Sequence, residues 1–326
     1  MNNNPIKISV CIPVYGVEKY IELCAHSLMR QTLKNGIEFI FINDCTKDNS
    51  IEILKRVISH YPLRKNQCHI IENKTNLGIA ATRNEALKYA TGEYIIYCDS
   101  DDWVEENMYE CMYSEAKIKN ADVVGCDFVM EYVSKSDLIP QKFLSTGKEC
   151  VKSLLNDDLH CGTWNKLIKR EIYIKSGIRF PSGINMWEDV ATIIPLMYFC
   201  DKVCYINQPL YHYRQTNITS YTKAKTHKSL IDMTDVISIL EKFFTTIQNS
   251  EFLHLLNFKK LTVKSNLLYN SCGQVQKKWC KIYPEVDEFI WSFKKISMPN
   301  RIALMLNRYG CLWGYNMIRS VSKLLN

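Results

Sequence analysis

The sequence predicts an α/β fold in which a mostly parallel sheet is flanked by helices and followed by a helical C-terminal region. Three observations support this prediction. Through the first 130 residues, short apolar runs alternate with stretches of helical periodicity. Such regular alternation is typical of parallel strands joined by crossover helices. From residue 226 onward only helical patterns follow, and 326 residues suffice for one large domain with an appendage.

Five apolar runs in the first 130 residues are predicted strands. The first contains Pro13, which is consistent with a buried strand that is leaving its sheet. The fourth stops abruptly in three carboxylates, Asp99, Asp101 and Asp102. The predicted strands are residues 8–14, 37–42, 68–71, 93–98 and 122–129.

Four helices are predicted between these strands. The first places Ile21, Cys24 and Leu28 at helical spacing. Residues 48–50, Asp-Asn-Ser, offer N-cap candidates for the second, and Gly92 follows the end of the third. The predicted helices are residues 17–31, 51–60, 79–90 and 105–119.

The pattern changes after residue 130. Residues 135–147 are predicted to form a loop. A mainly helical stretch follows from residue 148 and includes residues 164–169 and 190–198. Two short strands are predicted at residues 203–206 and 210–213.

Composition excludes several classes of protein. The apolar fraction of 47% is that of a soluble globular chain. Fourteen cysteines without a CxxC pair, and an N-terminus without an apolar signal core, predict reduced thiols in the cytoplasm. No HxH or HExxH pair suggests a zinc enzyme, and no apolar run reaches the roughly 18 residues of a membrane span. The chain also lacks the GxGxxG and GxxxxGK[ST] motifs of dinucleotide-binding folds and P-loop NTPases.

Acids and amides follow the predicted strands at the edge where ligands bind in parallel sheets. Residues 13–15, 43–44, 73–78 and 99–102 all lie at this edge. In an extended segment Asp99 and Asp101 face the same way, and two such charges repel unless a cation lies between them. Mg²⁺ or Mn²⁺ is typical of such a place, because these ions are held by one or two carboxylates plus substrate phosphates. The alternative is a solvated, charged turn.

Four motifs, in this order, resemble those of the family 2 glycosyltransferases. They are residues 8–15 (ISVCIPVY), 41–44 (FIND), 76–84 (NLGIAATRN), and 91–94 (TGEY) running into 99–103 (DSDDW). The match is strong over about residues 6–132, and continues weakly through 164–166 (WNK), 187–189 (WED) and 211–214 (YHYR). The resemblance implies a GT-A fold with a catalytic domain at residues 1–225 and a helical, basic region at 226–326. Within the catalytic domain, residues 1–132 would bind the donor and 133–225 would build the acceptor and catalytic side.

For a nucleotide-sugar donor, the resemblance implies specific contacts. Pro13 and Tyr15 would form a wall for the base, and Asp44 would accept a hydrogen bond from its imide N–H. The family often has Gly-Ser after this aspartate, whereas Cys45-Thr46 follows here, so the local turn is open to change. Asn76 and Gly78 would form a tight loop beside the donor.

The resemblance also implies contacts to the ribose, the diphosphate and the metal. Arg83 would bind a phosphate oxygen, unless it forms an ion pair with Glu85 or a neighbouring helix. Asp99 would face the ribose, with Asp101 as the direct metal ligand. Asp102 would orient Asp101 or cap the next helix. Three further residues are candidates for the same region: His212 as a metal ligand, diphosphate contact or structural residue, and Lys166 and Arg214 as phosphate partners. Trp164 and Trp187 would be either platforms for sugar rings or core residues.

The resemblance assigns the catalytic base to Asp189, with Glu188 as the fallback. The structural alternative is a pair of acids in the first turn of a helix, where they favour the helix dipole. The reaction implied is an inverting transfer of a sugar from a nucleotide-diphosphate donor, most simply a UDP-sugar, to a saccharide or lipid-linked saccharide in surface-polysaccharide assembly. Two alternatives stay open: a nucleotide- or carbohydrate-binding protein without turnover, and a sugar-1-phosphate nucleotidylyltransferase.

Positive charge is concentrated at the C-terminal end. From Lys259 onward there are twelve Lys or Arg and three acids, a charge of 12 − 3 = +9, so the rest of the chain is slightly acidic and the net charge is +7. Residues 300–325 place Ile302, Leu306, Tyr309, Trp313, Met317 and Val321 along a helical stripe with Arg301, Arg308, Arg319 and Lys323 interspersed. This pattern predicts a peripheral association with anionic lipid on the inner face of the cell membrane, or a helix packed onto the protein's own core. No motif for binding nucleic acid is present.

Overall fold

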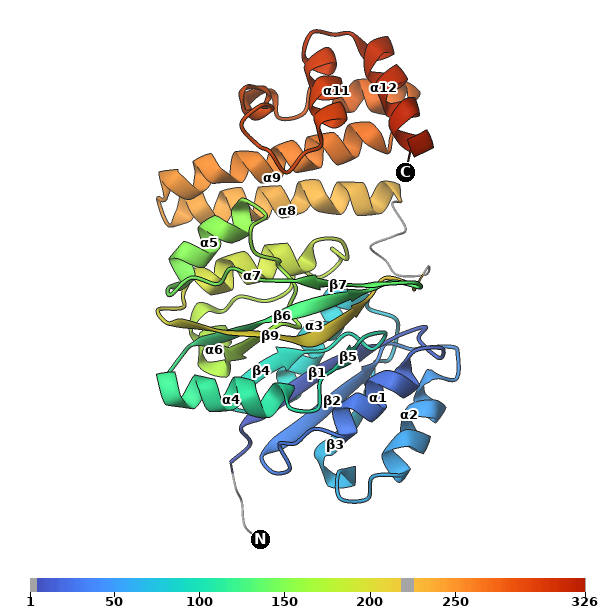
Figure 1. Ribbon diagram of the computed structural model, residues 1–326, viewed down its shortest axis with the longest axis vertical. Helices are drawn as coiled ribbons and strands as arrows, with labels where there is room; N and C mark the ends of the chain where they lie inside the picture. Colours follow the sequence, from blue (N-terminus) through green and yellow to red (C-terminus); the bar gives the residue numbers. More distant parts are fainter. Residues whose placement is uncertain (1–4, 218–225, 326) are drawn as a thin grey trace. The chain divides into compact units, whose positions relative to one another are not determined.

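The computed structural model describes residues 5–217 and 226–325, with side chains up to residue 320 (Figure 1). These residues fall into two compact units. The first consists mainly of the part before residue 218, and the second mainly of the part after residue 225. Each unit is described separately below.

The first unit is built on one mixed sheet with strand order β3-β2-β1-β4-β8-β6-β9-β5, with β7 paired to β6. The strands are β1 (Ile8–Val14), β2 (Ile37–Asn43), β3 (Cys68–Glu72), β4 (Tyr94–Tyr97), β5 (Trp103–Val104), β6 (Val123–Glu131), β7 (Ser136–Ile139), β8 (Lys166–Lys169) and β9 (Val203–Arg214). The helices are α1 (Ile21–Met29), α2 (Ser50–Ser59), α3 (Ile79–Tyr89), α4 (Met108–Lys119), α5 (Gly147–Leu155), α6 (Arg170–Ser176) and α7 (Glu188–Tyr198), with a 3-10 turn η1 (Lys65–Gln67).

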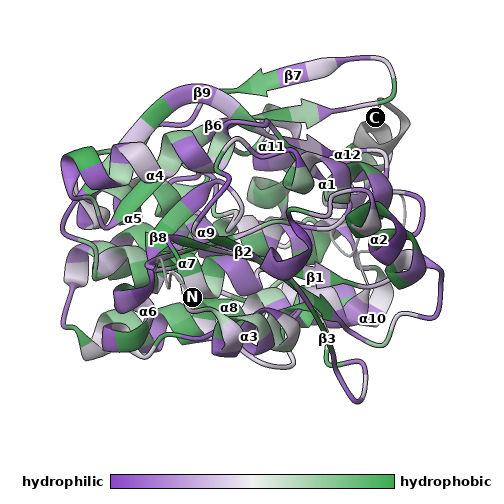
Figure 2. Cartoon of the chain, turned by 90° about the horizontal axis from the view of Figure 1, so that it is seen from below, coloured by the Kyte–Doolittle hydropathy of each residue, from purple (hydrophilic) through white to green (hydrophobic). Residues whose placement is uncertain are grey.

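The first half of the sheet is parallel, as the βα alternation predicts. β3, β2, β1 and β4 all run in one direction, and Val14 lies opposite Asn43 at the ends of β1 and β2. Every residue of β1 is buried, so helices cover both of its faces. Figure 2 shows hydrophobic residues along the strands and mixed colours on the surrounding helices. The aligned strand ends bring the loops after β1, β2 and β4 to one edge.

The second half of the sheet adds antiparallel pairings. β8 runs antiparallel to both β4 and β6, whereas β6 and β9 are parallel and lie side by side (Figure 1). β5 pairs antiparallel with the end of β9, and Trp103 lies opposite His212. This pairing brings the YHYR motif at residues 211–214 next to the segment that follows β4.

Three predictions for this half are wrong. The predicted loop at residues 135–147 contains strand β7, which pairs with β6. Residues 164–169, predicted as helical, include strand β8, because a run of only four residues cannot show a helical period. The two short strands predicted at residues 203–213 form one strand, β9. The break between them is where the register with β6 shifts, around Asp127.

The second unit is helical, as predicted from residue 226 onward. It contains α8 (His227–Thr246), α9 (Ser250–Tyr269), α10 (Gly273–Trp279), η2 (Pro284–Phe289), α11 (Met298–Arg308) and α12 (Leu312–Leu325). Side-chain oxygens cap the first two helices: Thr226 accepts from the Ser229 N–H at 3.1 Å, and Asn249 from the Phe252 N–H at 2.9 Å. Among residues 5–217 and 226–325, no helix combines the length and apolarity needed to cross a bilayer.

Candidate active site

The segment after β4, residues 99–102, is fixed to β9 by one tyrosine. The Tyr211 hydroxyl accepts a hydrogen bond from the Asp99 N–H at 3.2 Å and donates to Asp102 Oδ2 at 2.6 Å. The Arg214 N–H donates to the other oxygen of Asp102 at 2.7 Å. Asp102 is fully buried, so its carboxylate holds the turn in place. Asp102 is therefore not exposed, and it does not cap the next helix, which begins at Met108.

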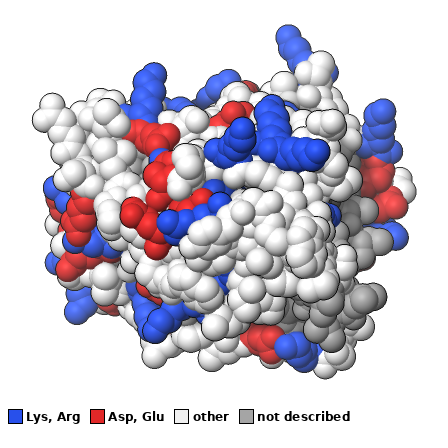
Figure 3. Space-filling model, turned by 90° about the horizontal axis from the view of Figure 1, so that it is seen from above, with Lys and Arg blue, Asp and Glu red and all other residues white. Residues whose placement is uncertain are grey.

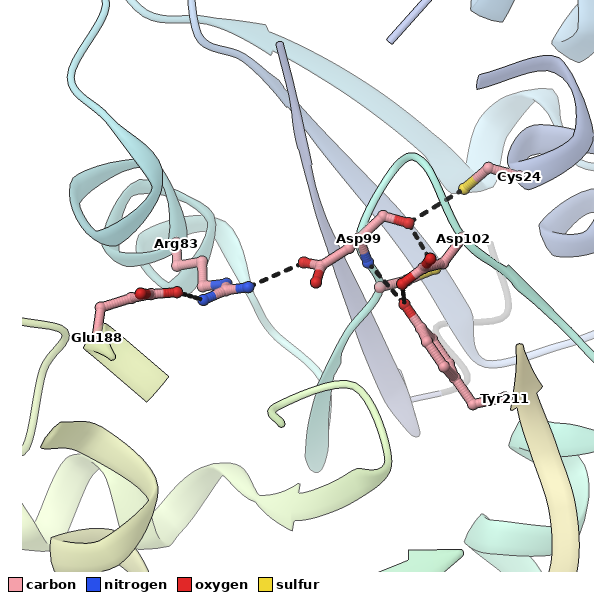
Figure 4. Close-up of polar contacts among 7 residues, drawn as sticks. Cys24, Arg83, Asp99, Asp102, Glu188 and Tyr211 are labelled. Atoms are coloured by element: carbon pink, nitrogen blue, oxygen red, sulfur yellow. Dashed lines mark hydrogen bonds and ion pairs between the residues drawn. The ribbon is translucent and has the colours of Figure 1, made fainter. Parts of the chain in front are cut away.

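Arg83 on α3 connects this turn to the start of α7 (Figure 4). Its Nη2 lies 2.9 Å from Asp99 Oδ1, and its Nη1 forms a short ion pair with Glu188. The guanidinium is buried against the rings of Tyr97 and Phe180. Burial would lower the pKa of Arg83, but Asp99 and Glu188 together hold it above its ordinary value. Arg83 thus links the turn after β4 to the first turn of α7 through two ion pairs.

The partners of Arg83 decide between the alternatives set by the sequence. Glu85 is not one of them, because it forms an ion pair with Lys88 at 2.6 Å. Glu188, on a neighbouring helix, is the partner instead. Whether a phosphate oxygen also reaches Arg83 stays a prediction.

The start of α7 has an unusual backbone. Trp187 immediately precedes it with φ at +66°, a left-handed conformation that costs a residue with a side chain about 1–3 kcal/mol. This turn places Glu188 and Asp189 in the first turn of the helix. Asp189 Oδ1 accepts the N–H of Val190 at 2.7 Å. Burial raises the pKa of the Asp189 carboxyl above its ordinary value.

Asp44, at the end of β2, organises the loop after β3. Its carboxylate accepts the N–H groups of Leu77 at 2.8 Å and Gly78 at 2.9 Å, and its backbone carbonyl accepts from Asn76 at 3.2 Å. Gly78 has φ at +80° and begins α3, which carries Arg83. The four predicted donor residues Asp44, Asn76, Gly78 and Arg83 are therefore linked through one loop and helix.

The turn after Asp44 explains the departure from the family pattern. Cys45 has φ at +58°, a conformation that glycine adopts without strain. The Cys45 thiol donates to the Asn73 carbonyl at 2.9 Å, a contact that glycine could not make. At the end of β1, Pro13 is buried, whereas Tyr15 is 54% exposed; their contacts with a base stay a prediction.

Asp101, the predicted metal ligand, is hydrogen-bonded by residues at and after the end of β9. Asn217 donates to Asp101 Oδ2 at 2.8 Å, and Arg214 Nε donates to its carbonyl at 2.7 Å. Burial, followed by the charge of Asp99, raises the pKa of Asp101. In the part of the chain that the structure describes, no three His, Cys, Asp or Glu gather as a complete metal cage. One or two carboxylates without such a cage fit Mg²⁺ or Mn²⁺, whose remaining ligands are water and substrate phosphates.

Two further candidates from the sequence, His212 and Lys166, have protein partners in this structure. His212 contacts Glu131 at 2.8 Å and Glu105 at 2.9 Å through its two ring nitrogens, and its metal role stays a prediction. Lys166 Nζ is buried and donates to the His160 and Gly162 carbonyls and to Asn165 Oδ1. These bonds use the three hydrogens of the ammonium group.

Trp164 is only 4% exposed and stacks on Tyr211 at 4.3 Å between ring centroids, so it belongs to the core. Sequence reasoning did not give individual roles to Tyr211 and Asn217, although the YHYR motif pointed to the first.

Comparison with known proteins identifies the family of this chain. The family model described as glycosyl transferase family 2 matches residues 9–177, which is more than half of the chain. The chain belongs to glycosyltransferase family 2. The region matched includes β1 to β6, α3 and the residue 99–102 turn, and thus most of the donor side described above.

Two bacterial proteins are similar to this chain in sequence. The cholesterol galactosyltransferase of Borreliella burgdorferi is 29% identical over 79% of this chain and 76% of its own. Glycosyltransferase GlyG of Streptococcus pneumoniae is 30% identical over 72% of this chain and 78% of its own.

A solved structure shares the fold. The crystal structure of S. aureus TarS 1–349 in complex with UDP-GlcNAc aligns with 98% of this chain and 92% of that chain, with a TM-score of 0.69 at 16% identity. The predicted GT-A fold is thereby confirmed for this family 2 member.

Proposed function

We propose that this protein is an inverting glycosyltransferase that moves a sugar from a UDP-sugar to a saccharide or lipid-linked saccharide acceptor. The observation that carries the proposal is the double ion pair of Arg83. It joins Asp99, at the start of the predicted donor and metal segment, to Glu188, beside the predicted base. A donor diphosphate and an acceptor hydroxyl that meet at this site would lie between Asp99 and Asp101 on one side and Glu188 and Asp189 on the other. Family membership favours transfer over the nucleotidylyltransferase alternative.

Asp189 is the proposed general base, and Glu188 is its structural neighbour. The Glu188 carboxylate forms an ion pair with Arg83, whereas Asp189 Oδ1 accepts the backbone N–H of Val190. In the reaction, Asp189 removes the proton from the acceptor hydroxyl, whose oxygen attacks the anomeric carbon. The bond to the diphosphate breaks on the opposite face, so the configuration inverts. Burial raises the pKa of both acids, that of Glu188 to about 8, and a raised pKa suits a base, so the choice of Asp189 rests on the contacts and not on the pKa.

Asp101 and Asp99 are the proposed holders of a divalent cation, with His212 nearby on β9. A bound cation would neutralise charge that grows on the leaving diphosphate. Burial and then the charge of Asp99 raise the pKa of Asp101, and a bound cation would offset both effects.

The donor side is proposed to bind uridine diphosphate. Exposed Tyr15 offers ring surface for a base, and Asp44 keeps an ordered loop beside it. The UDP-GlcNAc complex of the structurally similar TarS protein supports a uridine nucleotide. The acceptor is proposed to be lipid-linked and used in surface-polysaccharide assembly, in keeping with the lipid acceptor named for the cholesterol galactosyltransferase. The reaction would then take place in the cytoplasm, at the inner face of the membrane.

The test is a screen of the purified protein against several UDP- and GDP-sugars with Mn²⁺, with nucleotide release as the readout. We expect release from one UDP-sugar, its loss in EDTA, and its return with Mn²⁺ or Mg²⁺. Asp101→Ala should lower turnover by several orders of magnitude while the circular dichroism spectrum is preserved. Full activity in EDTA would exclude the metal role. Tight UDP binding without release from any donor, with or without acceptor, would support the binding-protein alternative.

A further inference from the structure

Two buried lysines in the second unit form ion pairs with nearby acids. Lys260 on α9 contacts Glu241 at 2.6 Å and Glu285 at 2.8 Å. Lys264, one turn later, contacts Asp287 at 2.6 Å. Both lysines are almost completely buried, so these pairs stabilise the inside of the unit and contribute little positive surface. Glu285 and Asp287 are therefore engaged with the core.

The surface around these pairs is strongly basic. Between residues 270 and 320 the chain has eight Lys or Arg and three acids, and two of the acids are Glu285 and Asp287. Six of the eight cations are exposed: Lys277, Lys278, Lys281, Lys294, Lys295 and Arg308. On the face drawn in Figure 3, Lys and Arg side chains gather beside a broad area without charge. Such a surface attracts an anionic partner.

Large apolar side chains are exposed on the same segment. α11 and α12 are adjacent helices, joined by a short link that contains Gly310 (Figure 1). We call the exposed apolar residues of this segment the hairpin face. It consists of Trp291, Met298, Ile302, Tyr309, Trp313 and Met317. Tyr309 is 75% exposed and Trp313 is 74% exposed, far more than an aromatic residue that packs in a core.

The periodicity shows that the hairpin face points away from the unit. On α11, Met298 and Ile302 are one turn apart, whereas Ala303 and Leu304 are the buried residues. On α12, Trp313 and Met317 repeat the spacing, and Tyr315 is buried. Each helix therefore has one apolar side inside the unit and a second one outside. A core-packed helix needs only the first.

We propose that the hairpin face is a membrane-binding surface for an anionic lipid bilayer. Trp and Tyr are the residues that sit best at the headgroup level, because each has an apolar ring and a polar tip. The exposed cations would lie on the anionic headgroups around them. Charge decides between a bilayer and a second copy of this chain: the segment is basic in both copies, so two hairpin faces would repel each other. The use of this surface in delivering a lipid-linked acceptor rests on the function proposed above, whereas its binding to lipid does not.

The experiment measures how the full-length protein partitions onto vesicles. It is mixed with vesicles that contain phosphatidylglycerol, or with vesicles of phosphatidylcholine alone, and sedimented. We expect binding only to the anionic vesicles, and release at high salt, because salt screens the headgroup charge. Tyr309→Ser with Trp313→Ser should lower the partition coefficient roughly 10-fold or more. The matched control is Leu63→Ser with Ile118→Ser, which removes two apolar residues of the first unit that are at least as exposed and should bind like the wild type.

A second pair of variants tests the charge. Lys281→Glu with Lys294→Glu should weaken binding by roughly 10- to 100-fold. Lys55→Glu with Lys119→Glu changes the net charge equally, but on exposed sites of the first unit, and should have a much smaller effect. Equal loss in both would mean that net charge alone drives binding and would overturn the assignment to the hairpin face.

Three results would overturn the proposal. They are wild-type protein that ignores anionic vesicles, serine variants that bind as well as wild type, and lipid-free self-association that the serine variants abolish. The last would assign the hairpin face to a second copy of the chain. Thermal melting checks that each variant folds. Nucleotide release in lipid-free buffer is measured on the same samples, so failure of lipid binding is distinguishable from failure of the transferase function.

Discussion

The hydroxyl of Tyr211 on β9 joins both ends of the four-residue turn after β4, because it accepts from the Asp99 N–H and donates to Asp102 Oδ2. The turn carries Asp101, the proposed metal ligand, between these two fixed points. Through these two hydrogen bonds, Tyr211 holds the turn that carries the proposed metal ligand. This arrangement makes Tyr211 a positioning residue whose effect can be separated from stability.

Tyr211→Phe keeps the ring that stacks on Trp164 but removes both hydrogen bonds of the hydroxyl. We expect a loss of stability of about 1–3 kcal/mol, because a buried carboxylate and a backbone N–H lose a partner. We also expect the Mn²⁺ concentration needed for UDP binding to rise, as measured by titration calorimetry. Tyr94→Phe is the matched control, since its buried hydroxyl donates to the Ala121 carbonyl at 2.8 Å on the same sheet. Equal Mn²⁺ dependence in the two variants would reduce Tyr211 to a structural role.

Arg83→Lys retains the positive charge but loses the guanidinium geometry that lets Arg83 bind two carboxylates at once. One ammonium group cannot take the place of Nη1 at Glu188 and Nη2 at Asp99 together. We expect kcat to fall at least tenfold and unfolding stability to decrease by about 1–3 kcal/mol, because one buried carboxylate loses its hydrogen-bond donor. Urea unfolding and nucleotide release measure the two effects. Arg56→Lys, in an exposed pair with Glu22, should change stability by less than about 1 kcal/mol.

Asp189→Asn and Glu188→Gln separate the proposed base from its neighbour. Asp189→Asn should lower kcat by about 10²–10⁴-fold with UDP affinity little changed, because it removes only the proton acceptor. Glu188→Gln should instead lower thermal stability, since it leaves Arg83 with one carboxylate fewer. If the kcat loss follows Glu188→Gln, the base is Glu188.

The pH profile gives an independent check on Asp189. Burial raises its pKa above the ordinary 3.8, and the base must be deprotonated to act. In the wild type, kcat should therefore fall as the pH drops through a pKa above that ordinary value. Asp189→Asn should remove this acidic limb from what activity remains. A limb that persists unchanged would place the titrating group elsewhere.

Asp101→Asn should stabilise the metal-free protein at neutral pH. A carboxyl whose pKa is raised by folding contributes stability below its unfolded pKa, and loses it as the pH rises through the folded pKa. At neutral pH the charged Asp101 is thus unfavourable, and the neutral amide removes this cost. We expect a higher Tm in EDTA, by about 2–4 °C for each kcal/mol gained, with a difference that shrinks toward acidic pH. With Mn²⁺ and UDP the order should reverse. Asp137→Asn, in an exposed pair with Lys135, is the control and should show neither effect.

Much of the fold follows from local pattern. The apolar run at residues 8–14 is strand β1 to the residue, because a fully buried strand is bounded by polar neighbours on both sides. The helices after β2 and β3 begin within one residue of their predicted starts. The donor-side motifs were recognisable for the same reason: each lies directly after a strand, and parallel strands align their ends.

Strands that depend on distant partners were not predictable in this way. β7 is a four-residue strand defined by its pairing with β6, and β8 is held between β4 and β6. Their sequences are too short to show a period of their own, so the pairing decides their conformation. The single strand β9 likewise depends on a register shift against β6 that no local pattern records.

The sequence by itself determined the family, the donor-side strand ends and the acids that line them, because those features are local. Only the tertiary structure decided the partners of the charged groups. Arg83 and Glu188 are 105 residues apart, and Tyr211 and Asp102 are 109 residues apart. Such contacts form because the sheet places β4, α3, α7 and β9 around one point, where burial makes an unpaired charge too costly to remain. Long-range pairing, rather than residue type, therefore determines which acids have structural partners and which are available for the proposed catalysis.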